Sequence, residues 1–252
     1  MVGILVAACF ICAMISTAQV GTRDSSIVTA VQELPDGFMK LKVANRSEIP
    51  VTAIVAVGDR VLKGSQKTVH SVRFFDSALD IFGRPALRTG EDYSFQFFGP
   101  RPTAESISSR SVGVGAVLFR DGLTWGDTKW IAILLRRRRL AYDYDRQALD
   151  ILMDARLHGM GGAEVLKRLR DRLEADRSQQ RDAVGKQMAV LCFEDVELVV
   201  QDAIDRSKAA TALSSAYRDR SLKVTDSAVQ RLLSRIEALQ EAISEPKARI
   251  RD

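Results

Sequence analysis

Histidine and cysteine are scarce in this chain. Its 252 residues include two histidines, His70 and His158, and three cysteines, Cys9, Cys12 and Cys192. Two histidines exclude an HExxH zinc site and any histidine-rich metal centre, because they lie in different halves of the chain. Cys192 is the only cysteine beyond the apolar first segment, so the rest of the chain cannot form an internal disulfide.

The common phosphate-binding and nucleophile motifs are also missing. The chain has no Walker A sequence, and no G-x-S-x-G elbow precedes a helical pattern. Asp143 and Asp145 form a D-x-D pattern, but on a helix their side chains diverge by about 200° and cannot hold one cation together. Cys192 lies in an apolar stretch without a neighbouring histidine, which predicts a small buried side chain rather than a reactive thiol. The sequence therefore predicts no catalytic residue, no cofactor and no metal site.

The charge of the chain is only mildly basic. Lys and Arg number 37 against 32 Asp and Glu, a formal net charge of +5. Neither half has the dense positive charge expected of a nucleic-acid-binding protein, so we do not expect a nucleic-acid partner. The hydrophobic share of 46% is typical of a globular protein.

Residues 1–18 form an apolar leader without a charged residue. The apolar run is short for a bilayer span, which needs about 20 residues, and Ser16 and Ala18 supply the small side chains that signal peptidase requires. We therefore expect a signal peptide that is cut between Ala18 and Gln19, and a protein exported to the periplasm or the extracellular space. The basic segment that usually begins such a signal is missing. The alternatives are lipidation at Cys9, and a leader that is retained as an anchor or as a buried helix.

Residues 26–127 predict a β domain. Short apolar runs alternate with turn residues at the spacing that is typical of antiparallel sandwiches. Asp121-Gly122 predicts a hairpin turn, because glycine readily adopts a positive φ. We therefore expect an immunoglobulin-like antiparallel β-sandwich. The expected strands cover residues 38–43, 50–57, 67–75, 93–98 and 112–119.

Residues 128–252 predict an all-α region. No proline occurs between Pro102 and Pro246, and apolar residues recur every three or four positions. The series Val229, Leu232, Ile236, Leu239 and Ile243 has the spacing of a coiled-coil seam. The whole chain is therefore expected to have an α+β fold, with a β-sandwich followed by coiled-coil-like helices. The expected helices cover residues 127–157 and 163–182, then one or two within 186–217, then 225–244.

Four consecutive arginines follow the apolar residues 130–135. A helix turns by roughly 100° per residue, so the four cannot share one face and at least one must flank the apolar stripe. The apolar stretch is far too short for a transmembrane span, which needs about 20 residues. We interpret the run as a solvated, partly paired helix face; the alternative is contact with an anionic envelope surface. The four residues are Arg136, Arg137, Arg138 and Arg139.

The two tryptophans, Trp125 and Trp130, flank the expected junction of the β and α regions. Asp127 is the expected N-cap of the first helix. We expect both indoles to be buried in the seam between the sandwich and that helix. If the two were exposed together, they would be candidate ligand-contact aromatics.

The chain resembles a group of uncharacterised exported bacterial proteins, found notably in acidobacteria. The resemblance rests on an apolar leader, the strand pair VANRSEIPVTAIV, the strand TGEDYSFQF, and the step FRDGLTWGD into a helix with arginines. It covers about residues 30–140. The group implies an exported protein, and it carries no assigned activity.

These patterns favour a non-enzymatic binding or interaction module in the cell envelope or the extracellular space. The expected partner is another protein, a second copy bound through the helical region, or an anionic surface polymer. One alternative is an enzyme that uses carboxylates, such as a glycosidase-like hydrolase without a recognisable motif. Another is a cytosolic regulator whose first helix is buried.

Overall fold

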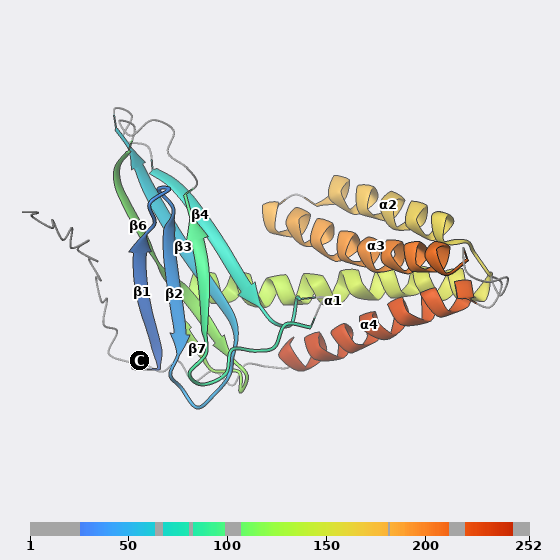
Figure 1. Cartoon of the computed structure of the whole chain (residues 1–252), viewed down its shortest axis with the longest axis horizontal. Coiled ribbons are helices and arrows are strands. Elements are labelled where there is room, and N and C mark those ends of the chain that lie inside the picture. Colours follow the sequence, from blue (N-terminus) through green and yellow to red (C-terminus); the bar gives the residue numbers. More distant parts are fainter. Residues whose placement is uncertain are drawn as a thin grey trace, which may run out of the picture.

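The computed structural model describes residues 26–63, 68–80, 83–98, 107–180, 182–211 and 220–243. Antiparallel strands occupy the first part of the chain and helices the second, which confirms the α+β class (Figure 1). The expected signal peptide, with Cys9, Ala18 and Gln19, lies outside the described residues. None of the described helices is apolar over a length that would cross a membrane.

The strands form two antiparallel sheets. One has three strands in the order β1-β2-β5, and the other has four in the order β4-β3-β6-β7. Each strand of the first sheet pairs over about its full length, whereas β7 pairs with β6 over three residues. The strand bounds are β1 (Ile27–Glu33), β2 (Met39–Asn45), β3 (Val51–Leu62), β4 (Thr68–Asp76), β5 (Asp92–Phe97), β6 (Ile107–Phe119) and β7 (Thr124–Gly126).

Apolar side chains from both sheets fill the space between them, so the strands form a β-sandwich. Leu41 and Val43 of β2 are fully buried against Ile54 of β3 and Val117 of β6. The half-buried Lys40 and the exposed Lys42 flank Leu41, because successive side chains of a strand point to opposite faces. Burial contributes about 25 cal/mol per Å² of apolar surface, so this inner layer is the main source of stability for the sandwich.

Asn45, the only asparagine of the chain, fixes the corner between β2 and β3. Its buried amide nitrogen donates to the carbonyl oxygens of Ile49 and Leu87, at 3.0 and 2.9 Å. Its amide oxygen accepts from the backbone nitrogen and the hydroxyl of Ser47. The side chain therefore links the loop after β2 to the backbone at Leu87, whose carbonyl oxygen also accepts from the backbone nitrogen of Val51.

The first helix, α1 (Thr128–Leu157), starts on the outer face of the four-stranded sheet. Asp127 is its N-cap, as expected, and the Asp127 carboxylate accepts from the backbone nitrogen of Lys129 at 2.7 Å. Leu134 is fully buried against Ala116 and the neighbouring outer-face residues of the sheet. A Cβ atom on Gly115 would lie 2.8 Å from the Trp130 ring, so the glycine lets the helix approach the sheet closely.

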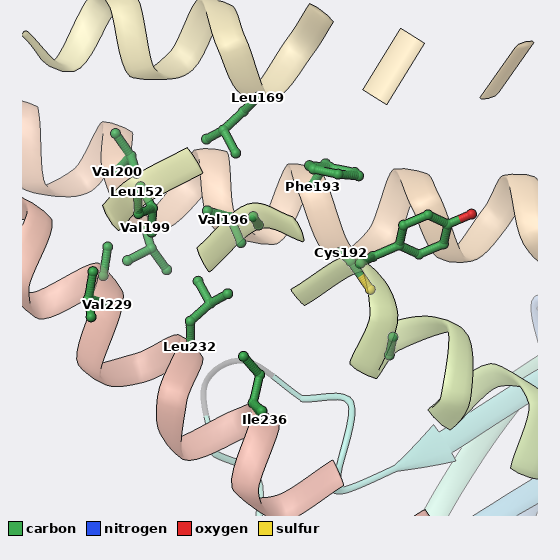
Figure 2. Close-up of a cluster of buried hydrophobic side chains, with 14 of the residues drawn as sticks. Leu152, Leu169, Cys192, Phe193, Val196, Val199, Val200, Val229, Leu232 and Ile236 are labelled. Atoms are coloured by element: carbon green, nitrogen blue, oxygen red, sulfur yellow. The ribbon is translucent and has the colours of Figure 1, made fainter. Parts of the chain in front are cut away.

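The second half of α1 runs through the helical region, with α2 (Gly162–Gln179) and α3 (Ala183–Thr211) on one side and α4 (Arg220–Ile243) on the other (Figure 1). The boundaries agree with the sequence expectation to within about six residues. Apolar side chains of all four helices converge in one core (Figure 2). The α4 seam faces that core, with Leu232 and Leu239 almost completely buried. The chain itself therefore supplies the partner that the seam requires.

The sandwich also contributes to the helical core. The turn after β4 places Leu79, which is 7% exposed, among the buried side chains of the helices. The two parts of the molecule consequently share packed surface beyond the covalent link at α1.

Substitutions at Gly113 and Gly115 of β6 test the close approach of α1 to the sheet. Gly115→Ala should lower the free energy of unfolding by about 1–3 kcal/mol, because the added methyl group meets the rigid Trp130 ring. Gly113 is the matched control, since no atom lies within 4 Å of a Cβ built there. Urea denaturation should show Gly113→Ala as neutral or slightly stabilising, and equal losses from both variants would contradict the packing described here.

Candidate functional site

The four arginines occupy four different environments around α1. Arg136 is exposed and pairs with Asp182 at 2.7 Å, and Arg139 is exposed. Arg137 and Arg138 are buried, with 6% and 3% of their surface exposed. The interpretation of the run as a solvated face is therefore wrong for these two residues. The prediction of an anionic-surface contact now applies only to Arg136 and Arg139.

Arg138 joins the helix to the sandwich. Its Nε and Nη2 atoms donate to both carboxylate oxygens of Asp76, at the end of β4, over 3.0 to 3.3 Å. Nη2 also donates to the Thr52 hydroxyl at 3.0 Å, and that hydroxyl in turn donates to the backbone carbonyl of Leu118. Both charged side chains are almost fully buried, so the pair is well shielded from solvent and from salt.

Arg137 lies beside Arg138 where α1 contacts the sandwich and α3. Its guanidinium carbon lies 4.0 Å from the centre of the Phe74 ring, and Nη1 donates to the Gln187 amide oxygen at 3.0 Å. Burial lowers the pKa of Arg137, against the opposing charge of Asp76. Contact with the aromatic face partly compensates for the lost hydration of the guanidinium.

A cleft of about 710 Å³ opens beside Arg138, where the sandwich, α1 and α4 meet. Clefts of this size at the junction of two structural units are common ligand sites. Its floor contains Thr52, Leu135 and Arg138. The remaining lining is residues 77–78, 83–86 and 118–122 of the sandwich, with Ala238, Glu241 and Ala242 of α4.

A second group of buried charges lies inside the helical core. Arg235 of α4 donates through Nε and Nη2 to the two carboxylate oxygens of Asp145 on α1, both at 2.5 Å. Its Nη1 donates to Asp195 on α3 at 2.7 Å. We call Arg235, Asp145 and Asp195 the ionic triad. Asp145 has no exposed surface, so the ionic triad is inaccessible to a substrate through that residue.

The charges of the ionic triad influence one another. Burial opposes the charged guanidinium of Arg235, but the hydrogen bonds and charge of Asp145 outweigh it and raise the pKa of Arg235. Burial raises the pKa of Asp145 and of Asp195, whereas the hydrogen bonds from Arg235 act in the opposite direction. The guanidinium therefore stays charged and is needed by both carboxylates.

Cys192 lies next to the ionic triad and is 1% exposed. Burial, followed by the negative charge of Asp145, raises the pKa of the Cys192 thiol. The thiolate is the nucleophilic form of cysteine, so this side chain is chemically inert. Its environment agrees with the sequence expectation of a small buried hydrophobic residue.

The two tryptophans lie on opposite faces of the four-stranded sheet. Trp125 packs on the core between the sheets, whereas Trp130 packs between the sheet and α1. The structure confirms a seam position for Trp130, but Trp125 faces the sandwich interior instead. Both are half-buried, and they do not form the joint aromatic surface considered from the sequence.

The two histidines lie in different parts of the fold. His70 pairs with Asp59 at 2.7 Å on the sandwich, and His158 pairs with Asp154 at 3.0 Å at the end of α1. Within the described ranges, no three His, Cys, Asp or Glu side chains lie close enough together to hold a metal ion.

Sequence reasoning missed Asp76, Asp145 and Arg235. A signal for Asp145 was present, because it repeats at helical spacing with Ala141, Ala148 and Leu152, which are all buried. Asp76 gave no such signal, since its partner Arg138 lies 62 positions away.

No protein-family model matches the chain, and comparisons with curated proteins and with solved structures give no match either.

Arg235 provides a test of the ionic triad. Arg235→Met should destabilise the fold by about 3–5 kcal/mol, because it leaves the buried Asp145 and the half-buried Asp195 without their counter-ion. Without that guanidinium, the pKa of Asp145 should rise further above its unfolded value. A carboxyl with a raised folded pKa loses stability as pH rises through that pKa, so the deficit should be larger at about pH 8 than at about pH 5.

The matched control is Arg231→Met, at an exposed position one turn earlier on α4. It should change the free energy of unfolding by less than about 0.5 kcal/mol at either pH. Thermal or urea denaturation measures both variants. A deficit for Arg235→Met that does not change with pH would show that the carboxylates do not depend on Arg235.

Proposed function

We propose that the protein is an exported, non-enzymatic binding module of the envelope or extracellular space, and that its partner binds in the cleft beside Arg138. The cleft is the observation that carries the proposal. It combines a volume suited to a small ligand or a peptide segment with a buried guanidinium on its floor. The apolar leader at residues 1–18 supports export.

The sandwich is proposed to be immunoglobulin-like. A constant-type immunoglobulin domain has its first, second, fifth and fourth strands in one sheet and its third, sixth and seventh in the other. The order β1-β2-β5 and β4-β3-β6-β7 agrees with this arrangement except that the fourth strand, β4, pairs with β3 and not with β5. Domains of this architecture are frequent in surface and secreted proteins, and the resemblance to exported acidobacterial proteins points the same way.

The helical region is proposed to be a rigid support rather than a free coiled coil. The seam expected to bind a partner is occupied by α1 and α3 of the same chain. Self-association through this seam would require α4 to leave its own core. Another protein that occupies the cleft is therefore a better partner than a second copy bound through the seam.

The two other functions receive less support. A carboxylate-based hydrolase needs two accessible carboxyl groups on either side of a scissile bond. In the ionic triad, the half-buried Asp195 and the fully enclosed Asp145 share one guanidinium instead. The cytosolic alternative depends on the leader, which lies outside the described residues.

Export is tested by the mass of the protein in its source cells. We expect the intact mass from the envelope or culture fraction to match a chain that begins at Gln19. Retention of residues 1–18 in a cytosolic fraction would refute export. Ala18→Pro is a useful variant, because proline next to the cut should block processing and leave the full-length mass.

Binding through the cleft is tested by photo-crosslinking in the same cells. A benzophenone amino acid placed at Ala238, on the α4 wall, should give a discrete crosslinked product. The matched control is Ser234, which is exposed on α4 one turn earlier and does not line the cleft. Identical products from the two positions, or none from Ala238, would exclude the cleft as the binding site.

A further inference from the structure

We infer that the cleft beside Arg138 binds a short, extended peptide segment that carries a basic side chain. This inference rests on the proposed binding function and adds the chemical class of the partner. It depends on three features of the cleft: a buried hydrogen-bond donor, the balance of charge around the lining, and walls made partly of small side chains.

Arg138 supplies the donor on the floor. The residue is 3% exposed, and its Nε and Nη2 atoms are taken by Asp76 and Thr52. Nη1 makes no hydrogen bond to any residue that the structure describes. Because Arg138 lines the cleft, a carbonyl oxygen of a bound ligand can accept from this nitrogen in place of water.

The charge around the cleft does not favour an anion. Asp76 balances the charge of Arg138, and Arg84 pairs with Asp80 at 3.4 Å while it stacks on Tyr93. The lining as a whole holds three arginines and two carboxylates, because Asp76 and Asp80 lie outside it. Once Arg138 and Arg84 are paired with these two, the charged side chains that remain are Arg120, Asp121 and Glu241, of which two are acidic. A ligand with a neutral acceptor at the floor and a cation toward Glu241 therefore complements the lining better than a phosphate or a carboxylate does.

The walls leave room for an extended backbone. Small residues form part of the lining, Ala238 and Ala242 on α4 and Gly83, Pro85 and Ala86 on the sandwich, beside larger ones such as Arg84 and Phe119. The small side chains do not project across the cleft, so a peptide main chain can enter and place a carbonyl group on Arg138. The volume of about 710 Å³ suits a few residues rather than a single amino acid.

The experiment uses the full chain and two blocked peptides that differ in one charge. The probe is acetyl-Ala-Lys-Ala-Ala-amide, and the comparisons are acetyl-Ala-Glu-Ala-Ala-amide and inorganic phosphate. We expect the lysine peptide to shift the backbone amide signals of Gly83, Gly122 and Ala242 in a ¹⁵N–¹H spectrum. An affinity near the millimolar range is expected for so short a ligand.

Two pairs of variants locate the contact. Glu241→Gln should weaken the lysine peptide by about two- to fivefold, the effect of one solvent-exposed ion pair, whereas the exposed Glu237→Gln should not. Ala238→Trp should abolish the shifts by filling the cleft, and Ser234→Trp should preserve them. All four positions are exposed on α4, and unchanged spectra elsewhere report that each variant is folded.

Three outcomes would overturn the inference. One is the absence of any shift with the lysine peptide. Another is stronger binding in the cleft by the glutamate peptide or by phosphate, which would make it an anion site. The third is a set of shifts that Ala238→Trp leaves unchanged, which would place the peptide elsewhere. Each of these outcomes would exclude a basic peptide as the ligand of the cleft. The proposed binding function is tested separately, by crosslinking at position 238.

Discussion

The contact of Arg138 with Asp76 and Thr52 is the interaction on which the shape of the molecule depends. It joins the middle of α1 to the ends of two strands, at a point where both charges are almost fully buried. A buried pair of this kind tolerates little displacement, because separation would leave each charge without solvent or partner. Together with Leu79, which packs into the helical core, it holds the sandwich against the helices. The cleft exists because these contacts keep its two sides apart at a fixed spacing.

Buried charge has a different role within the helices. An apolar seam alone allows α4 to slide or rotate along its neighbours, because hydrophobic contact is not directional. Arg235 contacts α1 and α3 at the same time through hydrogen bonds that require one register. Single buried polar groups set register in coiled coils in the same way. The ionic triad therefore gives α4 a defined position, and α4 provides one wall of the cleft.

The proposed binding site is bounded by segments that belong to the sandwich, α1 and α4. The helix wall, the hairpin at residues 120–122 and the turn after β4 are all attached to packed elements. A site that is formed in advance loses less conformational entropy on binding. Arg136 and Arg139 remain on the surface of α1, away from the buried seam, so a contact with an anionic surface would be separate from the cleft.

Much of the fold could be predicted from local patterns. Apolar spacing placed the helices to within about six residues, and the Asp127 cap and the buried state of Cys192 followed from residue type and neighbours. The position of the two tryptophans was only half right, because strand register decides which face of a sheet a residue occupies. Trp125 and Trp130 lie on either side of a strand-to-helix turn. Their separation in the sequence does not indicate which face of the sheet each one contacts.

The sequence by itself determined that strands precede helices and located five of the seven described strands, β1 and β7 excepted, since periodicity and turn residues act over a few neighbours. Only the tertiary structure decided which arginines are buried and what they bind. Arg138 meets Asp76 and Thr52 across 62 and 86 positions, and Arg235 meets Asp145 across 90. Four consecutive side chains of a helix point in four directions. The sequence does not indicate what lies in any of these directions. The partners of Arg138 and Arg235, and the cleft, result from packing between segments that are far apart in the sequence. Local sequence patterns do not show which of these segments meet.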